Sequence, residues 1–217
     1  MEAFLDQLHA RARQHPVFQR LAVVSRLLLA LAFLPTSVVK ILGHRFTSLG
    51  TDTPVGAFFE AMFQTGGYWR FLGWCQLLAG CCLLVPRLAT VGAVMFFPIV
   101  LNIFVITVAV HFTGTPFITG PMLLASFFLL CWDYDRLKPI LGWGRSPARD
   151  SWSVPMRPLE RAGYALGTLG GLLVLSTFRG FGGRPVAVAG LGTAALGSVL
   201  VLAGWWRAAT TPRTVAG

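Results

Sequence analysis

Six long apolar stretches alternate with short polar segments along the chain. They cover residues 21–42, 68–85, 88–112, 119–137, 162–178 and 185–206. Each is close to the roughly 20 residues that a helix needs to cross a bilayer. No small-residue cleavage pattern follows the first stretch, so we interpret it as a retained helix and not as a signal peptide. The pattern predicts an all-α integral membrane protein.

The segment between the first two stretches predicts a shorter helix, residues 54–64. Pro54 suits the first helical position, Asp52 or Thr53 suits the cap before it, and Gly66 and Gly67 end it. Eleven residues are too few to cross a membrane. Aromatic side chains crowd one side of this helix, while Glu60 and Gln64 lie on another, so we expect it to rest in the outer interface as a lid.

Composition and charge support the membrane assignment and give an orientation. The chain is 55% hydrophobic and only 12% charged, whereas soluble domains carry about 25% charged residues. With the N-terminus inside, twelve basic residues fall in cytoplasmic segments and four in outer ones. We therefore expect both termini in the cytoplasm and the bacterial inner membrane as location. The net charge of +10 is scattered between apolar runs, which favours phospholipid headgroups over nucleic acid as the anionic partner.

The composition predicts four segments. Residues 1–20 form a cytoplasmic segment, 21–137 a four-helix membrane core with the interfacial helix 54–64, 138–161 a basic cytoplasmic loop, and 162–217 a glycine-rich transmembrane hairpin. The loop includes Trp143 and Trp152 and suits anionic lipid or a protein partner. In the hairpin, Gly163, Gly167 and Gly171 follow a four-residue spacing that lets helices approach closely. They serve either packing within the hairpin or a homo-oligomer surface.

Polar side chains inside the first four stretches are the candidates for function, because such groups are costly in a bilayer. Arg26 and Lys40 fall on nearly the same helix face; each either faces a site or extends to the nearer headgroup layer. Gln76 and Asn102 lie near the middle of the second and third stretches. They are either pocket residues or hydrogen-bonding links between helices.

His111 ends the third stretch and precedes an irregular segment, residues 112–121. It suits proton transfer, metal binding or hydrogen bonding to a quinone carbonyl; the alternative is an interfacial histidine bonded to the following turn. The four cysteines form no CxxC pair and are interpreted as packing residues, so no metal site is expected. The irregular backbone after His111 predicts a pocket in the outer leaflet.

The segment Arg26–Lys138 resembles the DoxX-like family of small bacterial membrane proteins. The resemblance rests on Ser37 and Lys40 at the end of the first helix and on four further segments: Phe71–Gly80 (FLGWCQLLAG), Pro86–Gly92 (PRLATVG), Asn102–Thr115 and Cys131–Lys138 (CWDYDRLK). Gln76 stands where the family often has a carboxylate, and the helical pair after residue 161 exceeds the usual four-helix core. The resemblance implies a link to redox chemistry with quinone as acceptor.

These observations lead to two functional hypotheses. In the first, the protein is a membrane-embedded redox accessory that interacts with quinone, with Lys40, Gln76, Asn102 and His111 in the pocket and Glu60 at its mouth. The chain encodes no cofactor or electron donor, so a redox partner subunit is implied and the chain is not assigned as an enzyme by itself. In the second, the protein is a non-catalytic membrane scaffold or assembly subunit.

Overall fold

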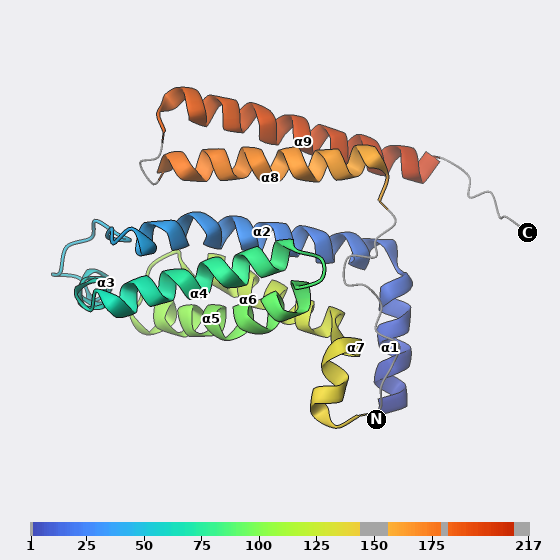
Figure 1. Cartoon of the computed structure of the whole chain (residues 1–217), viewed down its shortest axis with the longest axis horizontal. Helices are drawn as coiled ribbons and strands as arrows, with labels where there is room; N and C mark the ends of the chain where they lie inside the picture. Colours follow the sequence, from blue (N-terminus) through green and yellow to red (C-terminus); the bar gives the residue numbers. More distant parts are fainter. Residues whose placement is uncertain (1, 144–155, 179–181, 211–217) are drawn as a thin grey trace, which may run out of the picture. The chain divides into compact units, whose positions relative to one another are not determined.

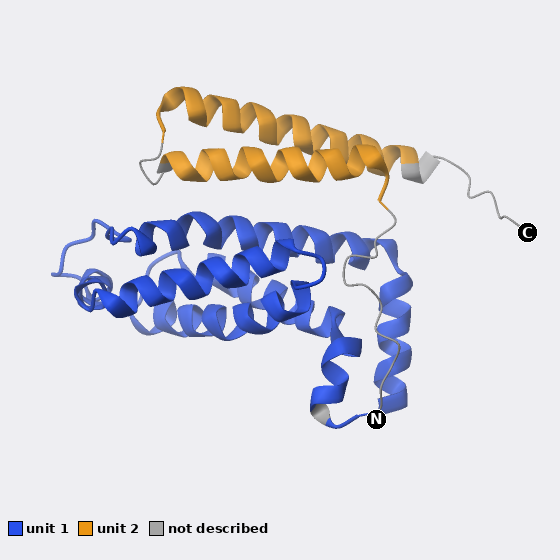
Figure 2. Cartoon of the chain, viewed as in Figure 1, with its two compact units in different colours: residues 1–154 blue, residues 155–217 orange. Residues whose placement is uncertain are grey.

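The computed structural model describes residues 2–143, 156–178 and 182–210 (Figure 1). These residues form helices and connecting segments, with no strand among them. The chain divides into two compact units, residues 1–154 and residues 155–217 (Figure 2). Each unit is described by itself below.

Unit 1 is built around four helices: α2 (Pro16–Ile41), α4 (Gly67–Leu84), α5 (Ala89–Ala109) and α6 (Pro116–Trp132). Helix α2 packs on α4 and α6, α4 packs on α5, and α5 packs on α6. The short connections from α4 to α5 and from α5 to α6 favour antiparallel packing of these neighbours, whereas the longer connection from α2 to α4 contains a further helix. These four helices form a helical bundle over residues 16–132, which overlaps the segment 21–137 of the sequence prediction.

The interior of unit 1 is apolar. Its buried side chains are Ala22, Leu29, Phe33, Ala79, Leu83, Ala93, Phe96, Val100, Leu129 and Trp132. The Phe33 and Phe96 rings meet at a centroid distance of 4.2 Å across the centre of the bundle. Gly92 allows α5 to approach α4, because a Cβ there would lie 2.6 Å from the backbone nitrogen of Leu83.

The short helix predicted from Pro54 and its neighbours is α3 (Pro54–Gln64). Thr53 is its cap, with Oγ1 accepting a hydrogen bond from the Gly56 amide at 3.1 Å. Helix α3 packs against the start of α4, where the Phe63 and Trp69 rings meet edge to face. We call this end of unit 1 the α3 end.

The opposite end, which we call the α1 end, differs from the expectation. Residues 2–14 form α1 (Glu2–Gln14), which the sequence analysis did not assign. The predicted continuous helix 119–137 is wrong: α6 stops at Trp132, and a 67° bend leads into α7 (Tyr134–Leu137) and η1 (Lys138–Leu141). Figure 1 shows α1 and α7 running crosswise to α2. The bend falls at Asp133, whose carboxylate is buried against Arg26.

Within the residues that the structure describes, three helices are long and apolar enough to cross a membrane: Pro16–Ile41, Ala89–Ala109 and Arg184–Arg207. The bent pair Pro116–Trp132 with Tyr134–Ile140 would make a fourth. These helices are compatible with a multi-pass membrane protein. The predicted stretches 68–85 and 162–178 are helical, as α4 and α8, but are not in this set. Polar residues in their first turns, such as Arg70 and Glu160, lower the hydropathy of both.

Unit 2 is the predicted hairpin, formed by α8 (Pro158–Phe178) and α9 (Arg184–Thr210). The two helices meet at small residues. A Cβ on Gly163 would lie 2.8 Å from the carbonyl oxygen of Gly197, and one on Gly170 would lie 2.6 Å from that of Gly190. Small residues here serve packing within the hairpin. Of the predicted loop 138–161, residues 144–155, including Trp152, lie outside the described residues.

Candidate functional site

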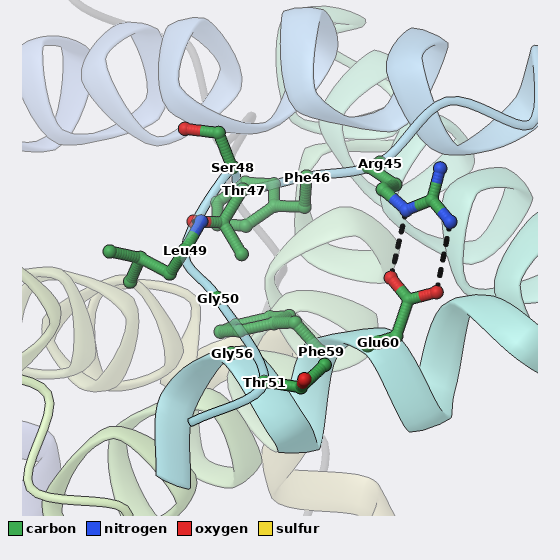
Figure 3. A pocket seen from close by; sticks show the side chains of 10 residues that line it. All are labelled: Arg45, Phe46, Thr47, Ser48, Leu49, Gly50, Thr51, Gly56, Phe59 and Glu60. Atoms are coloured by element: carbon green, nitrogen blue, oxygen red, sulfur yellow. Dashed lines mark hydrogen bonds and ion pairs between the residues drawn. The ribbon is translucent and has the colours of Figure 1, made fainter. Parts of the chain in front are cut away.

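A pocket of about 220 Å³ lies at the α3 end, between the segment that follows α2 and the face of α3 (Figure 3). Its walls combine aromatic rings, hydroxyl groups, backbone and one ion pair. The lining residues are Arg45, Phe46, Thr47, Ser48, Leu49, Gly50, Thr51, Gly56, Phe59 and Glu60. The pocket is smaller than the ~300–1,000 Å³ typical for drug-sized ligands. It is suited to a single ring or a small polar headgroup.

Gly56 explains how the segment 45–51 comes to rest on α3. A Cβ at position 56 would lie 2.8 Å from the carbonyl oxygen of Leu49 and 2.7 Å from the carbonyl carbon of Gly50. Only glycine therefore permits this close approach of backbone to backbone. The Thr53 hydroxyl also donates to the Gly50 carbonyl at 2.9 Å. These contacts fix the segment as the outer wall of the pocket.

Arg45 and Glu60 form a bidentate ion pair on one side of the pocket. Arg45 Nε donates to Glu60 Oε2 at 2.8 Å and Nη2 to Oε1 at 2.9 Å (Figure 3). Gln64, one turn along α3, donates to the same carboxylate at 2.7 Å. The hydrogen bonds from Arg45, followed by that from Gln64, lower the pKa of Glu60 to about 2.

This pKa predicts a pH dependence of stability. Because the Glu60 pKa is lower in the folded state, the ion pair stabilises the fold above the ordinary pKa of about 4.5, and this contribution is lost as pH falls toward about 2. Thermal unfolding between about pH 6 and about pH 3 should therefore show a smaller loss of stability in Glu60→Gln than in the wild type. The difference will be small, since the Arg45 side chain is 58% exposed and screened by solvent. Parallel curves for the two proteins would contradict the assignment.

Lys40 lies next to this pocket in an aromatic cage. Its ammonium nitrogen is 4.8 Å from the centroid of Phe46, a lining residue, and 5.4 Å from that of Trp69. Lys40 Nζ donates to the Thr36 carbonyl at 3.4 Å, and the residue is 6% exposed. Trp69 is held by a hydrogen bond from its indole nitrogen to the His44 carbonyl at 3.0 Å. The structure thus places a buried positive charge against one wall of the pocket.

Gln76 is buried between α4 and α2, on the same face of α4 as Trp69 and Gly73. Gly73, one turn away, lies against α2: a Cβ there would be 2.9 Å from Lys40 Cβ and from the Ser37 carbonyl oxygen. Gln76 Oε1 has no hydrogen-bond partner. It does not line the pocket, and among the described residues it forms no hydrogen-bonded link between helices.

Asn102 and His111 are exposed, and neither lines the pocket. His111 has a positive φ of 52° and follows the end of α5. The His111 amide donates to the Val108 carbonyl at 3.1 Å, and the Phe112 amide donates to the Thr107 carbonyl at 2.9 Å. This is a helix-ending turn in which a left-handed residue satisfies terminal carbonyls. Of the five predicted pocket residues, then, Glu60 lines the pocket, Lys40 adjoins it, and the other three lie elsewhere.

A second polar cluster, at the α1 end, was not predicted. Arg26 and Asp133 are both fully buried, and Arg26 Nη2 lies 3.3 Å from each Asp133 oxygen. The Thr90 hydroxyl donates to Asp133 Oδ2 at 3.0 Å and accepts a hydrogen bond from Arg136 Nη1 at 3.2 Å. The long side chain of Arg26 therefore does not extend to a headgroup layer. A charge inside an apolar stretch needs a partner, and the acidic Asp133, inside the fourth stretch 119–137, was the signal in the sequence that could have indicated this pair.

Ion pairs and hydrogen bonds attach α1 to this cluster. Lys138 Nζ lies 2.8 Å from carboxylate oxygens of Asp6 and Glu2. His9 contacts Asp135 at 3.3 Å through Nδ1 and the Trp132 carbonyl at 3.0 Å through Nε2. The Arg13 guanidinium stacks on the Trp132 ring at 4.4 Å. The charged side chains of this cluster pair with one another across α1, α2 and the segment that follows α6, so we assign it a structural role.

Chemically, the α3 end combines hydrogen-bond donors with an aromatic wall and an adjacent buried cation. Such a site can hold an acceptor-rich ring and favour negative charge on it. No group of three or more metal-ligating side chains occurs in the described part of the chain. Comparison of the chain with models of protein families, with curated proteins and with solved structures finds no match.

Proposed function

We propose that the protein is a membrane-embedded redox accessory that binds the headgroup of a quinone in the pocket at the α3 end. The observation that carries this proposal is the position of the Lys40 ammonium against Phe46, a wall of a pocket that also contains Arg45 and three hydroxyl groups. Quinone carbonyls accept hydrogen bonds, and the quinone ring is flat and apolar. The pocket offers donors and aromatic surface for these two features.

Individual residues have distinct parts in this proposal. Arg45, Thr47, Ser48 and Thr51 supply donors to carbonyl oxygens. The rings of Phe46 and Phe59, whose centroids are 5.2 Å apart, supply a surface against which a ring can stack. The quinone supplies the two-electron chemistry when bound, with electrons from a redox partner. Lys40 then favours the negative charge that develops on the ring oxygen during reduction.

The proposal includes a membrane arrangement. The chain would cross the bacterial inner membrane with α1 and both termini on the cytoplasmic side and the α3 end on the outer side. Basic residues support this direction, because Arg13, Arg136 and Lys138 gather at the α1 end. In this arrangement the pocket lies at the outer end and is covered by the interfacial helix α3. The ring of an amphiphilic molecule can reach it from the bilayer.

Quinone binding is tested by titrating the purified protein with a short-chain ubiquinone analogue and following quenching of tryptophan fluorescence. We expect saturable quenching, and we expect Arg45→Gln to weaken binding about tenfold, as for loss of one charge-assisted hydrogen bond worth ~1.4 kcal/mol. Lys40→Met should weaken it in the same direction.

The matched control is Arg70→Gln, the same substitution at an exposed arginine of the same end that does not line the pocket. It should bind the analogue as the wild type does. Equal weakening by Arg45→Gln and Arg70→Gln, or quenching that does not saturate in the wild type, would contradict the proposal.

An assembly subunit without redox chemistry is the second candidate. It is favoured by the exposed apolar face of α9, which includes Val188, Leu191, Val199 and Leu202, each at least 60% exposed. A face of this kind suits lipid or another membrane helix. This candidate predicts that the protein leaves the membrane with a second subunit and without quinone.

A further inference from the structure

One polar side chain lies on an exposed, otherwise apolar face of α5. Asn102 is three residues from the midpoint of this helix, about 4.5 Å along its axis. It is exposed, and within the described part of the chain its amide makes no hydrogen bond. Helix α5 has the highest hydropathy of the three long apolar helices. In a bilayer, an amide at this depth lacks water as a partner, which favours a hydrogen bond to another helix.

The side chains around Asn102 form a continuous exposed face along α5. Val91, Val94, Pro98, Val105 and Ala109 are all exposed and lie within about 40° of Pro98 around the helix at 100° per residue. Asn102 falls in the same sector. The opposite face of α5 is buried against α4 and α6. The valine side chains of this face offer van der Waals contact to a second helix, and such packing drives helix association in lipid.

We propose that this face binds the same face of a second copy of the chain, with the two Asn102 amides hydrogen-bonded to each other across a two-fold axis. A carboxamide both donates and accepts, so two identical amides related by such an axis satisfy each other with two reciprocal bonds. A self-complementary face is what a symmetric dimer requires.

The hairpin of the same chain is the competing occupant, and its hydroxyl groups argue against it. Thr168, Ser176 and Thr177 of α8 and Thr193 and Ser198 of α9 all donate to carbonyls of their own helices. These hydroxyl oxygens can still accept a hydrogen bond, but they have no further proton to donate, so they satisfy only the donor half of the Asn102 amide. A second Asn102 offers both a free donor and a free acceptor.

Disulfide cross-linking in native membranes tests the contact. In full-length protein with the four natural cysteines replaced, Val105→Cys should form an intermolecular disulfide on oxidation with copper phenanthroline. The matched control is Leu124→Cys on α6, which is 70% exposed and should remain monomeric. Adding Asn102→Leu to Val105→Cys should lower the cross-linked fraction about fivefold, whereas Asn102→Gln should retain it.

Four results would overturn the proposal. Val105→Cys would cross-link no better than Leu124→Cys, or Asn102→Leu would leave the cross-linked fraction unchanged. Alternatively, a Val105→Cys/Val199→Cys protein would form an intramolecular disulfide, which would place the hairpin on α5 instead. Because Asn102 is exposed in the monomer, Asn102→Leu should leave thermal unfolding of the monomer unchanged. A loss of monomer stability in this variant would likewise count against a surface role.

Discussion

Arg26→Met is expected to lower the free energy of unfolding by about 3–5 kcal/mol, the cost typical of removing one partner of a buried ion pair. In the variant, Asp133 keeps the Thr90 hydrogen bond but loses its buried positive partner. Neither Arg26 nor Asp133 has exposed side-chain surface, so water does not compensate. Denaturant unfolding in detergent, followed by circular dichroism, measures the loss.

Two comparisons isolate the ion pair. Arg87→Met makes the same substitution at an exposed arginine and should change stability by less than about 0.5 kcal/mol. The double variant Arg26→Met/Asp133→Leu removes both charges and should recover most of the loss. An Arg26→Met protein as stable as the wild type would contradict the account of this cluster. So would a double variant no more stable than Arg26→Met alone.

Gly170→Ala is expected to destabilise the α8–α9 hairpin by about 1–3 kcal/mol through overpacking. The added Cβ would lie 2.6 Å from the Gly190 carbonyl oxygen and would also clash with the Ala194 backbone. The helices must separate to admit it. Amide hydrogen exchange of α8 and α9 should therefore quicken in this variant.

Gly167→Ala provides the control, since it makes the same change one turn away. A Cβ at Gly167 has no atom within 4 Å outside its own chain neighbours, and alanine favours the helix over glycine by about 0.5–1 kcal/mol. We expect exchange in this variant to be unchanged or slower. Equal acceleration in both variants would show that the hairpin does not pack through Gly170.

Local sequence signals predicted α3 well because each signal acts through its own backbone. Pro54 fixes a helical φ, Thr53 caps the first turn, and the bounds Pro54–Gln64 are those observed. The apolar stretches likewise predicted the positions of the long helices to within a few residues. The end of α6 was wrong because Asp133 pairs with Arg26, 107 residues away in the chain. No local pattern contains that contact.

The candidate site was only partly predictable for a similar reason. Lys40 and Glu60 stand out in the sequence as a charge in an apolar run and a charge on a short helix. The pocket itself depends on the segment 45–51 resting on Gly56, a backbone contact that no periodicity indicates. Asn102 and His111 were assigned to the same pocket as Lys40 because of their positions along the apolar stretches. A position along a helix does not determine the direction in which the side chain points.

Glycine spacing shows the same limit. The four-residue repeat of Gly163, Gly167 and Gly171 indicated a close helix contact, and α8 does pack on α9 through small residues. The register differs, because Gly170 also makes the approach to Gly190. An α-helix has 3.6 residues per turn, so residues spaced exactly four apart rotate gradually around the helix axis. They therefore leave the face that contacts the second helix, and the extent of that face also depends on the crossing angle.

Native mass spectrometry of the protein, gently extracted from its own membrane, tests the proposed function most directly. We predict a stoichiometric quinone bound to the wild type and to Arg70→Gln, and a clearly lower bound fraction in Arg45→Gln and Lys40→Met. Protein that carries only phospholipid, or that retains quinone equally in all four forms, would contradict quinone binding at the α3 end.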